Sequence, residues 1–206
     1  MTVADVVTSI EDLESIYGAF PEAARTKETP MITPLQRRWI EASPFALLAT
    51  AGPEGLDCSP RGDPAPLVRV VDERTLRLPD RRGNNRLDSL RNIVVDGRVG
   101  LLFLVPGLTT TLRVNGTAVL RADEALRQSL AMGDKLPACV IEVTVTSVYT
   151  QCPKALIRSS LWDPASFRDA ADLPTVGAIM AEITAGEFDG QAYDVAYPQR
   201  IKDTIY

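Results

Sequence analysis

The segment 81–86, Arg-Arg-Gly-Asn-Asn-Arg, carries the side chains with the clearest chemical use in this chain. A short apolar run ending at Pro79 predicts a strand before it. Leu87, Leu90 and Val94 recur at helical spacing after it, which predicts a strand, a basic turn and a helix. The helix would begin with free backbone N–H groups and the positive end of its dipole. Surrounded by guanidinium groups, this arrangement predicts a phosphate site.

The residues of this turn have different expected roles. Asn84 is the expected N-cap of the helix, and Asn85 supplies a second side-chain amide. Arg81, Arg82 and Arg86 surround the two amides with positive charge. An exposed arginine-rich turn with an ordinary asparagine cap explains the same pattern without a ligand, so the residues alone leave both interpretations open.

Composition limits the class of protein. The chain has 206 residues, 45% of them hydrophobic, which is long enough for one domain with a substantial core, and we predict a single domain over 1–206. Its net charge of −5 argues against a nucleic-acid partner, because a large positive field is absent. The longest apolar run, 99–105, is too short to span a bilayer, so no membrane partner is expected.

The expected compartment is the cytoplasm. The N-terminal residues 1–14 are acidic and lack the apolar stretch of a signal peptide. The three cysteines are odd in number and show no C-x-x-C spacing, which predicts reduced thiols rather than a disulfide framework or a zinc site.

The chain has no histidine. This excludes Ser-His-Asp and Cys-His catalysis and every histidine-ligated metal, so no metal site and no catalytic side chain is predicted. Cys58 and Ser59 are expected to pack, because no base is available to activate them. The glycine motifs of dinucleotide-binding and P-loop proteins are also absent. Any chemistry is therefore expected from a bound cofactor.

The apolar pattern predicts seven short strands, mostly joined by tight turns, with one helix among the early strands. The strands are expected at 45–51, 56–60, 67–71, 75–79, 99–105, 111–121 and 139–149. This order favours an α+β, mainly β fold built as an antiparallel Greek-key barrel over 44–150.

Helices are expected on both sides of the barrel. Residues 1–43 should hold two, the first with a capping box of Thr8 and Glu11 and an apolar face that runs to Phe20, the second beginning at Pro34. A further helix is expected over 122–132, and short helices over 154–160, 175–184 and 192–201 in the C-terminal extension 151–206.

Four motifs, in this order and spacing, resemble the pyridoxamine 5'-phosphate oxidase-like family of FMN-binding split barrels. They are S-P-R-G-D at 59–63, R-G-N-N-R-L-D-S-L at 82–90, V-G-L-L-F at 99–103 and T-L-R-V-N-G at 111–116. The segment 154–164 is similar to one branch of that family, a group of FMN-dependent bacterial proteins.

The resemblance implies a homodimer of split barrels with one FMN in each of two clefts at the interface, and a small-molecule substrate. It implies that the flavin phosphate is held by the turn and by basic residues of the preceding hairpins, and that the ring lies against a later strand, often of the partner subunit. The cofactor-binding residues that it implies are Arg61, Arg69, Arg82, Asn84, Asn85, Arg86, Thr111, Arg113 and Trp162.

Three of these residues also have plain structural interpretations. Arg61 could pair with Asp63 in a turn. Arg113 could be a solvated residue on the outer side of its strand. Trp162 could be a core or interface anchor rather than a cofactor contact.

The activity that the resemblance implies is an FMN-dependent oxidoreductase. A relative that uses the deazaflavin F420, a protein that stores or senses flavin, and a structural protein without cofactor are the alternatives. The branch usually has histidine in place of Gln151, and the C-terminal substrate motif of pyridoxamine phosphate oxidases is absent, so vitamin B6 oxidation is not expected.

Overall fold

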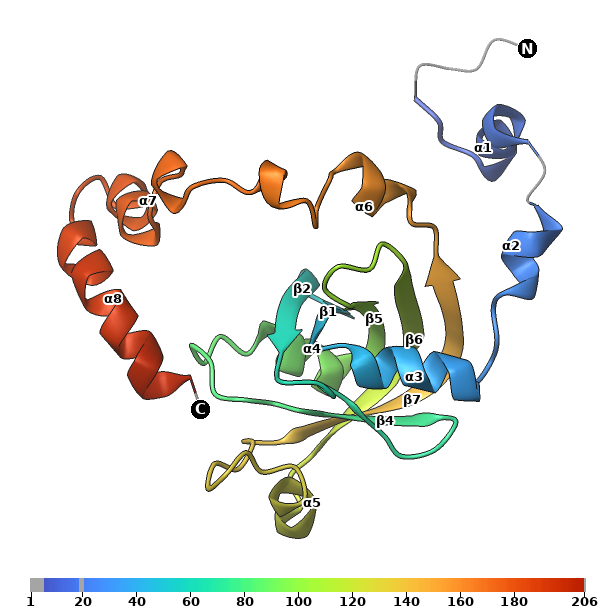
Figure 1. Cartoon of the computed structure of the whole chain (residues 1–206), viewed down its shortest axis with the longest axis horizontal. Coiled ribbons are helices and arrows are strands. Elements are labelled where there is room, and N and C mark those ends of the chain that lie inside the picture. The colour runs from blue at the N-terminus through green and yellow to red at the C-terminus, as the bar shows by residue number, and fades with distance from the viewer. Residues whose placement is uncertain (1–5, 19–20, 206) are drawn as a thin grey trace.

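A strongly curved antiparallel sheet forms the centre of the computed structural model, which describes residues 6–18 and 21–205 (Figure 1). Its strands are β1 (Phe45–Gly52), β2 (Gly55–Gly62), β3 (Arg69–Val70), β4 (Thr75–Pro79), β5 (Arg98–Leu104), β6 (Thr111–Arg121) and β7 (Val140–Gln151). They lie in the order β2-β1-β5-β6-β7-β4-β3, and each neighbouring pair is antiparallel. The curled sheet with β2 and β3 as its edges confirms the predicted mainly β, split-barrel architecture.

The core fills the inside of this curl. Large side chains from five strands are at most 1% exposed, and they are Leu48, Leu76, Leu78, Leu101, Phe103, Leu112 and Ile141. Each buried side chain of this size stabilises the fold by about 1.5–3 kcal/mol. The predicted alternation of β7 is confirmed, because Val143 and Val145 are buried while Thr144 and Thr146 are exposed.

Two helices pack on the sheet. In α3 (Pro34–Ala42), Pro34 occupies the first turn as predicted, Thr33 and Gln36 form a capping box, and Ile40 is fully buried. In α4 (Asp88–Val95), Asn92 donates from Nδ2 to Thr50 Oγ1 of β1 at 3.1 Å. This contact places the second half of α4 beside the end of β1.

The helix expected over 122–132 is shorter than predicted. Here α5 spans only Glu124–Gln128. The chain then turns at Gly133, whose φ is +59°, and Met132 and Lys135 form an isolated bridge. A glycine in the left-handed region favours this tight turn over a further helical turn.

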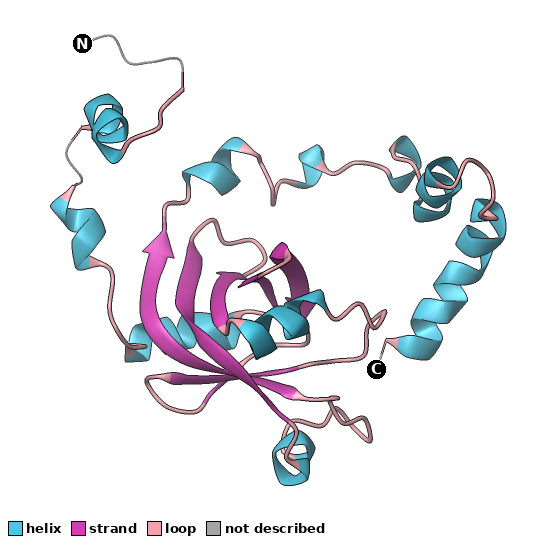
Figure 2. Cartoon of the chain, turned by 180° about the vertical axis from the view of Figure 1, so that it is seen from behind, coloured by secondary structure: helices cyan, strands magenta, loops and turns pink. Residues whose placement is uncertain are grey.

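Both ends of the described chain extend beyond the barrel as helical arms (Figure 2). The arms contain α1 (Ile10–Tyr17), α2 (Glu22–Thr26), α6 (Lys154–Arg158), α7 (Val176–Ile183) and α8 (Gly190–Thr204), with 3-10 turns at Pro164–Ser166 and Ala170–Asp172. The N-cap of α1 is Ser9 and not Thr8, because the Ser9 hydroxyl accepts from Asp12 N at 3.1 Å. Phe20, expected on the apolar face of this helix, lies outside the described residues.

Candidate functional site

The expected phosphate turn joins β4 to α4, but Asn84 does not cap the helix. The N-cap position is Leu87, which has no capping side chain. Asn84 Oδ1 instead accepts from Arg86 N at 3.0 Å, and Asn85 has a φ of 58°. The predicted cap is therefore wrong, because the asparagine carbonyl is used in a local Asx turn that competes with capping. The first N–H groups of α4 are left without a capping side chain.

Two serine hydroxyls lie beside this uncapped helix start. Ser89, in the first turn of α4, is 3% exposed, and its Oγ lies 2.8 Å from Ser59 Oγ on β2. Ser89 also donates to the carboxylate of Asp57. Ser59, expected to pack rather than to act as a nucleophile, is therefore part of a polar group between β2 and α4.

Arg61 continues this polar group. Its Nε donates to Ser59 Oγ at 3.3 Å, and its Nη1 pairs with Asp80 Oδ1 at 2.6 Å. Asp63 instead pairs with Arg81 Nε at 2.7 Å, so the interpretation that Arg61 pairs with Asp63 is wrong. We call the linked groups of Asp57, Ser89, Ser59, Arg61 and Asp80 the polar chain.

The two other arginines of the turn are exposed. The Arg86 side chain is 78% exposed, and its Nε lies 2.5 Å from Asp88 Oδ2. The hydrogen bond to Asp88 raises the pKa of Arg86 above its ordinary value. Arg82 is also exposed, and within the described ranges it has no hydrogen bond or ion pair. Its charge is available to a ligand.

A second group of polar side chains lies where β6 begins and β7 ends. Arg113 donates from Nη1 to Tyr149 Oη at 3.2 Å, and its Cζ lies 5.6 Å from the centre of the Tyr149 ring. Gln151 accepts from the same guanidinium at 3.1 and 3.2 Å in the amide orientation that satisfies both groups. Arg113 is half-buried, and these contacts with Tyr149 and Gln151 fix the position of its guanidinium. We call Arg113, Tyr149 and Gln151 the outer cluster.

Thr111 and Trp162 lie at this same end of the sheet. Thr111 is 3% exposed and pairs with Gln151 across the β6–β7 ladder. Trp162 donates from Nε1 to the carbonyl oxygen of Leu108 at 2.9 Å, which fastens the start of the C-terminal arm to the β5–β6 connection.

The polar chain and the outer cluster lie on opposite faces of the sheet. Arg61 is level with Ala46 and Phe103 in the strand register, whereas Arg113 is level with Leu102 and Leu47. Ala46 and Phe103 are buried inside the barrel, so Leu47 and Leu102, one residue along, point outward. One protomer therefore does not bring Arg61 and Arg113 to one ligand.

Arg69 lies in a neighbouring cleft rather than in the polar chain. It donates to Ser129 Oγ at 3.2 Å and to Ser129 O at 2.6 Å. Arg37, Arg81 and Pro79 line the same cleft, whose volume is about 230 Å³. The guanidinium of Arg69, which the resemblance implies for cofactor binding, is therefore held by Ser129 at the C-terminal end of α5.

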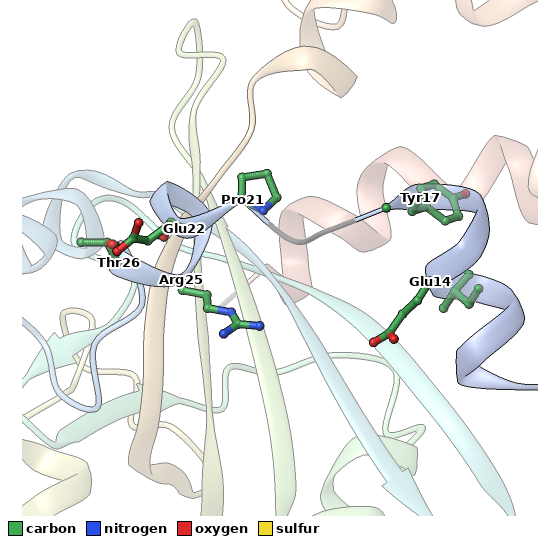
Figure 3. A pocket seen from close by; sticks show the side chains of 8 residues that line it. Glu14, Tyr17, Pro21, Glu22, Arg25 and Thr26 are labelled. Atoms are coloured by element: carbon green, nitrogen blue, oxygen red, sulfur yellow. Dashed lines mark hydrogen bonds between the residues drawn. The ribbon is translucent and has the colours of Figure 1, made fainter.

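A much larger space, about 1460 Å³, lies between α1 and α2 (Figure 3). Figure 3 shows Glu14 and Tyr17 on one helix, well apart from Glu22 and Thr26 on the other. None of the residues that the sequence predicted for a site lines this space, so we interpret the space as the gap between two helices of the N-terminal arm.

Cys58, Cys139 and Cys152 are free thiols, and burial raises the pKa of the Cys139 thiol. No helix in the described part of the chain is long and apolar enough to cross a membrane.

Comparisons with known proteins place this fold. The family model described as pyridoxamine 5'-phosphate oxidase matches residues 32–152, which is more than half of the chain. HupZ of Group A Streptococcus is a similar solved structure, with a TM-score of 0.48 and 21% identity over 58% of this chain and 94% of that one. No curated protein matches.

Two other solved structures carry names that state a ligand. An FMN-binding protein of Syntrophomonas wolfei has a TM-score of 0.45 and 12% identity over 56% of this chain and 83% of its own. A FAD-binding protein of Mesorhizobium loti has a TM-score of 0.41 and 13% identity over 61% of this chain and 99% of its own.

Proposed function

Because this chain belongs to the pyridoxamine 5'-phosphate oxidase family, we propose that it is a homodimeric flavoprotein that binds FMN. The proposed activity is the transfer of hydride or electrons between a reduced donor and a small molecule. The observation that carries the proposal is the uncapped start of α4 beside Arg61, Ser59 and Ser89.

These residues fit the phosphate end of FMN. A helix start without a capping side chain offers backbone N–H groups and a positive dipole end to an anion. Ser59 and Arg61 can add donors from β2, and the hydroxyl of Ser89 on α4 can add another if it turns from Asp57 to the phosphate. The exposed charge of Arg82 adds attraction from the turn.

Three carboxylates near this position oppose an anion. Asp80 is neutralised by Arg61 at 2.6 Å, and Asp57 accepts from Ser89. Asp88 is paired with Arg86, but that pair is exposed, and exposed pairs stabilise a fold by about 1 kcal/mol or less. A phosphate can therefore displace Asp88 from Arg86 without a large loss of stability.

The ring end of the site requires the second protomer. Arg113 points away from Arg61, on the outer face of the sheet. That face is apolar along β1 and β5, where Phe45, Leu47, Leu102 and Leu104 remain only partly buried. Burial of this face against a second copy would remove the apolar surface from water. In this proposal the partner subunit's outer cluster lies near the polar chain of the first copy.

A bound flavin supplies hydride transfer at N5 of its ring. In this proposal Arg113 provides positive charge at the N1 and O2 side of the ring, where negative charge builds up on reduction. Tyr149 and Gln151 hold its guanidinium in position. Trp162, fastened to Leu108, provides an apolar wall beside the opening.

The first prediction concerns the purified protein. It is expected to be yellow, to show the absorption bands of an oxidised flavin, and to release FMN on denaturation, as identified by mass spectrometry. Under anaerobic conditions NADH or NADPH is expected to bleach the colour, because hydride moves to N5.

Other results would change the assignment. Release of F420 would show that the protein is the deazaflavin-binding alternative. Release of FAD would show that the site binds the larger flavin nucleotide. Tight FMN binding without bleaching by any reduced nicotinamide would favour storage or sensing. A protein that stays colourless in excess FMN contradicts the proposal.

The second prediction concerns Arg86. Arg86→Ala is expected to weaken FMN binding by about tenfold to a hundredfold, the range for a charge-assisted hydrogen bond. Arg86→Lys should retain most of the affinity, because it keeps the charge. The matched control is Arg98→Ala, since Arg98 is 73% exposed and pairs with Asp96 at 2.6 Å in the same local manner. Fluorescence titration with FMN measures all three. Equal affinity of the two alanine variants would show that Arg86 does not contact the phosphate.

A further inference from the structure

The last two helices, α7 and α8, pack against each other and form a hairpin. A Cβ placed on Gly177 would lie 2.1 Å from Gly190 O, so the two backbones touch where the helices cross. Asp194 of α8 accepts from Gly177 N at 2.9 Å and from the hydroxyl of Thr175. These contacts fix the angle between the helices.

The hairpin leaves apolar side chains in water. Ile183 is 77% exposed, Val195 78%, Ile205 60% and Val176 51%. Both views show the hairpin standing apart from the sheet, at the far end of the segment that leaves β7 (Figures 1 and 2). Exposed apolar side chains on a rigid, uncovered surface mark an interaction site.

The surface area of the protomer indicates how large the covering partner is. Its accessible surface is 13853 Å², whereas a compact monomer of 22.4 kDa exposes about 9,400 Å². The excess of about 4,400 Å² is shared by the N-terminal and C-terminal arms, and it is more than one partner contributes to a typical obligate dimer interface, about 1,000–2,500 Å². The arms therefore expose enough surface for an interface of the size found in obligate dimers.

Charge argues against other partners. Residues 175–205 contain five acidic and two basic residues, a net charge of −3. An acidic surface is repelled by nucleic acid and by anionic lipid headgroups. Of the partners considered, a protein surface is the one that this charge does not exclude.

The arm also begins at the proposed dimer interface. It leaves β7 at Gln151, a member of the outer cluster, and Trp162 fastens its first part beside Leu108. We propose that the α7–α8 hairpin of each protomer docks on the barrel of the second copy, so that the two arms are exchanged across the dimer. This inference rests on the proposed homodimer. Reciprocal exchange fits a two-fold axis, because each copy then gives and receives the same element.

The third prediction tests the docking with a buried charge. Val195→Glu, and separately Ile183→Glu, is expected to raise the dissociation constant of the dimer at least tenfold, because each puts a carboxylate into an apolar interface. The matched control is Gln191→Glu, which adds the same charge to an exposed position of α8 and should leave dimerisation unchanged. Sedimentation equilibrium over a dilution series measures the constants. Far-UV circular dichroism and thermal melting verify that each variant is folded.

A second measurement, photo-crosslinking from the hairpin, tests which chain the hairpin contacts. A photo-crosslinking residue at position 183, in dimers mixed from ¹⁴N and ¹⁵N chains, is expected to join light to heavy chains through barrel residues. The same residue at Asp134, which is exposed on the loop after α5, is the control position. Links confined to one chain would show that the hairpin folds back on its own barrel, and this would overturn the exchange.

The outcomes separate this inference from the proposed function. A colourless dimer with crosslinks between chains refutes flavin binding but retains the exchange. A yellow dimer without such crosslinks, and with no effect of Val195→Glu, refutes the exchange alone. A yellow monomer refutes both the homodimer and the exchange, while flavin binding stands.

Discussion

Arg61→Ala is expected to lower the free energy of unfolding by about 3 kcal/mol and to weaken FMN binding by about a hundredfold. The first effect follows from burial. The side chains of Arg61 and Asp80 are only 19% and 13% exposed, so removal of the guanidinium leaves Asp80 with an uncompensated charge. Breaking a buried pair from one side costs about 3–5 kcal/mol, and the partial exposure here favours the lower end.

The second effect follows from the position of Arg61 beside Ser59, whose hydroxyl contacts Ser89 in the first turn of α4. Since stability and binding change together in this variant, the double variant Arg61→Ala/Asp80→Asn separates them. It removes both charges, so most of the stability is expected to return, whereas the FMN affinity should stay low because the phosphate has lost its donor.

Urea denaturation and FMN titration of the wild type, Arg61→Ala, Asp80→Asn and the double variant give both quantities. If the double variant regains wild-type FMN affinity, Arg61 acts only by neutralising Asp80 and does not contact the phosphate. If Arg61→Ala is as stable as the wild type, the ion pair contributes nothing to the fold.

The strands were the most predictable part of the fold, and the reason is physical. In β7, residues such as Val143 and Thr144 alternate between the core and water, and only a strand places them so. Likewise Pro34 predicted the start of α3, because proline lacks the N–H that a first helical turn leaves unpaired. These signals are local, and local signals can be read from the sequence.

The candidate site was less predictable, because it depends on contacts between distant segments. Asn84 has the residue type of an N-cap, but its side-chain oxygen accepts from Arg86 N in a local Asx turn and so does not cap the helix. Arg61 has Asp63 two residues away and Asp80 nineteen residues away, and the fold selects Asp80. Nothing in the local sequence distinguishes these two acids.

One signal for the polar chain was present in the sequence. Asp57, Ser59 and Arg61 alternate along β2, so they share one face of the strand, and a polar row on the inward face of a barrel strand needs a polar neighbour. Ser89 supplies it from α4. That Arg61 and Arg113 face opposite sides could not be known before the strand register was fixed, since a shift of one residue inverts every side chain.

The exposed apolar side chains of the C-terminal arm also depend on distant contacts. Helices were predicted over 175–184 and 192–201, in segments separated by proline and glycine, and α7 and α8 confirm them. Periodicity states which side of a helix is apolar, but it does not state what covers that side. In this chain the covering surface is proposed to come from a second copy.

Gly116→Ala is expected to destabilise the protein by about 3 kcal/mol, although it adds a single methyl group. Where β6 passes Gly116, β7 contains an extra residue, Thr146, whose hydroxyl donates to Asn115 O at 3.1 Å. The irregularity presses the strands together, so that a Cβ on Gly116 would lie 2.2 Å from Thr144 O. A backbone oxygen cannot move aside as a flexible side chain can, so the two central strands must separate.

Gly62→Ala is the matched control, because a Cβ there meets its nearest atom, in the Phe45 side chain, at 3.7 Å, an ordinary contact. It should change stability by no more than about 0.5 kcal/mol. The two variants are compared by urea denaturation. Separation of β6 from β7 would also move Arg113 relative to Tyr149, so Gly116→Ala should weaken FMN binding even where the protein remains folded. Equal stability of the two alanine variants would mean that the strands at the bulge are not in backbone contact, and the close β6–β7 approach that positions the outer cluster would then be wrong.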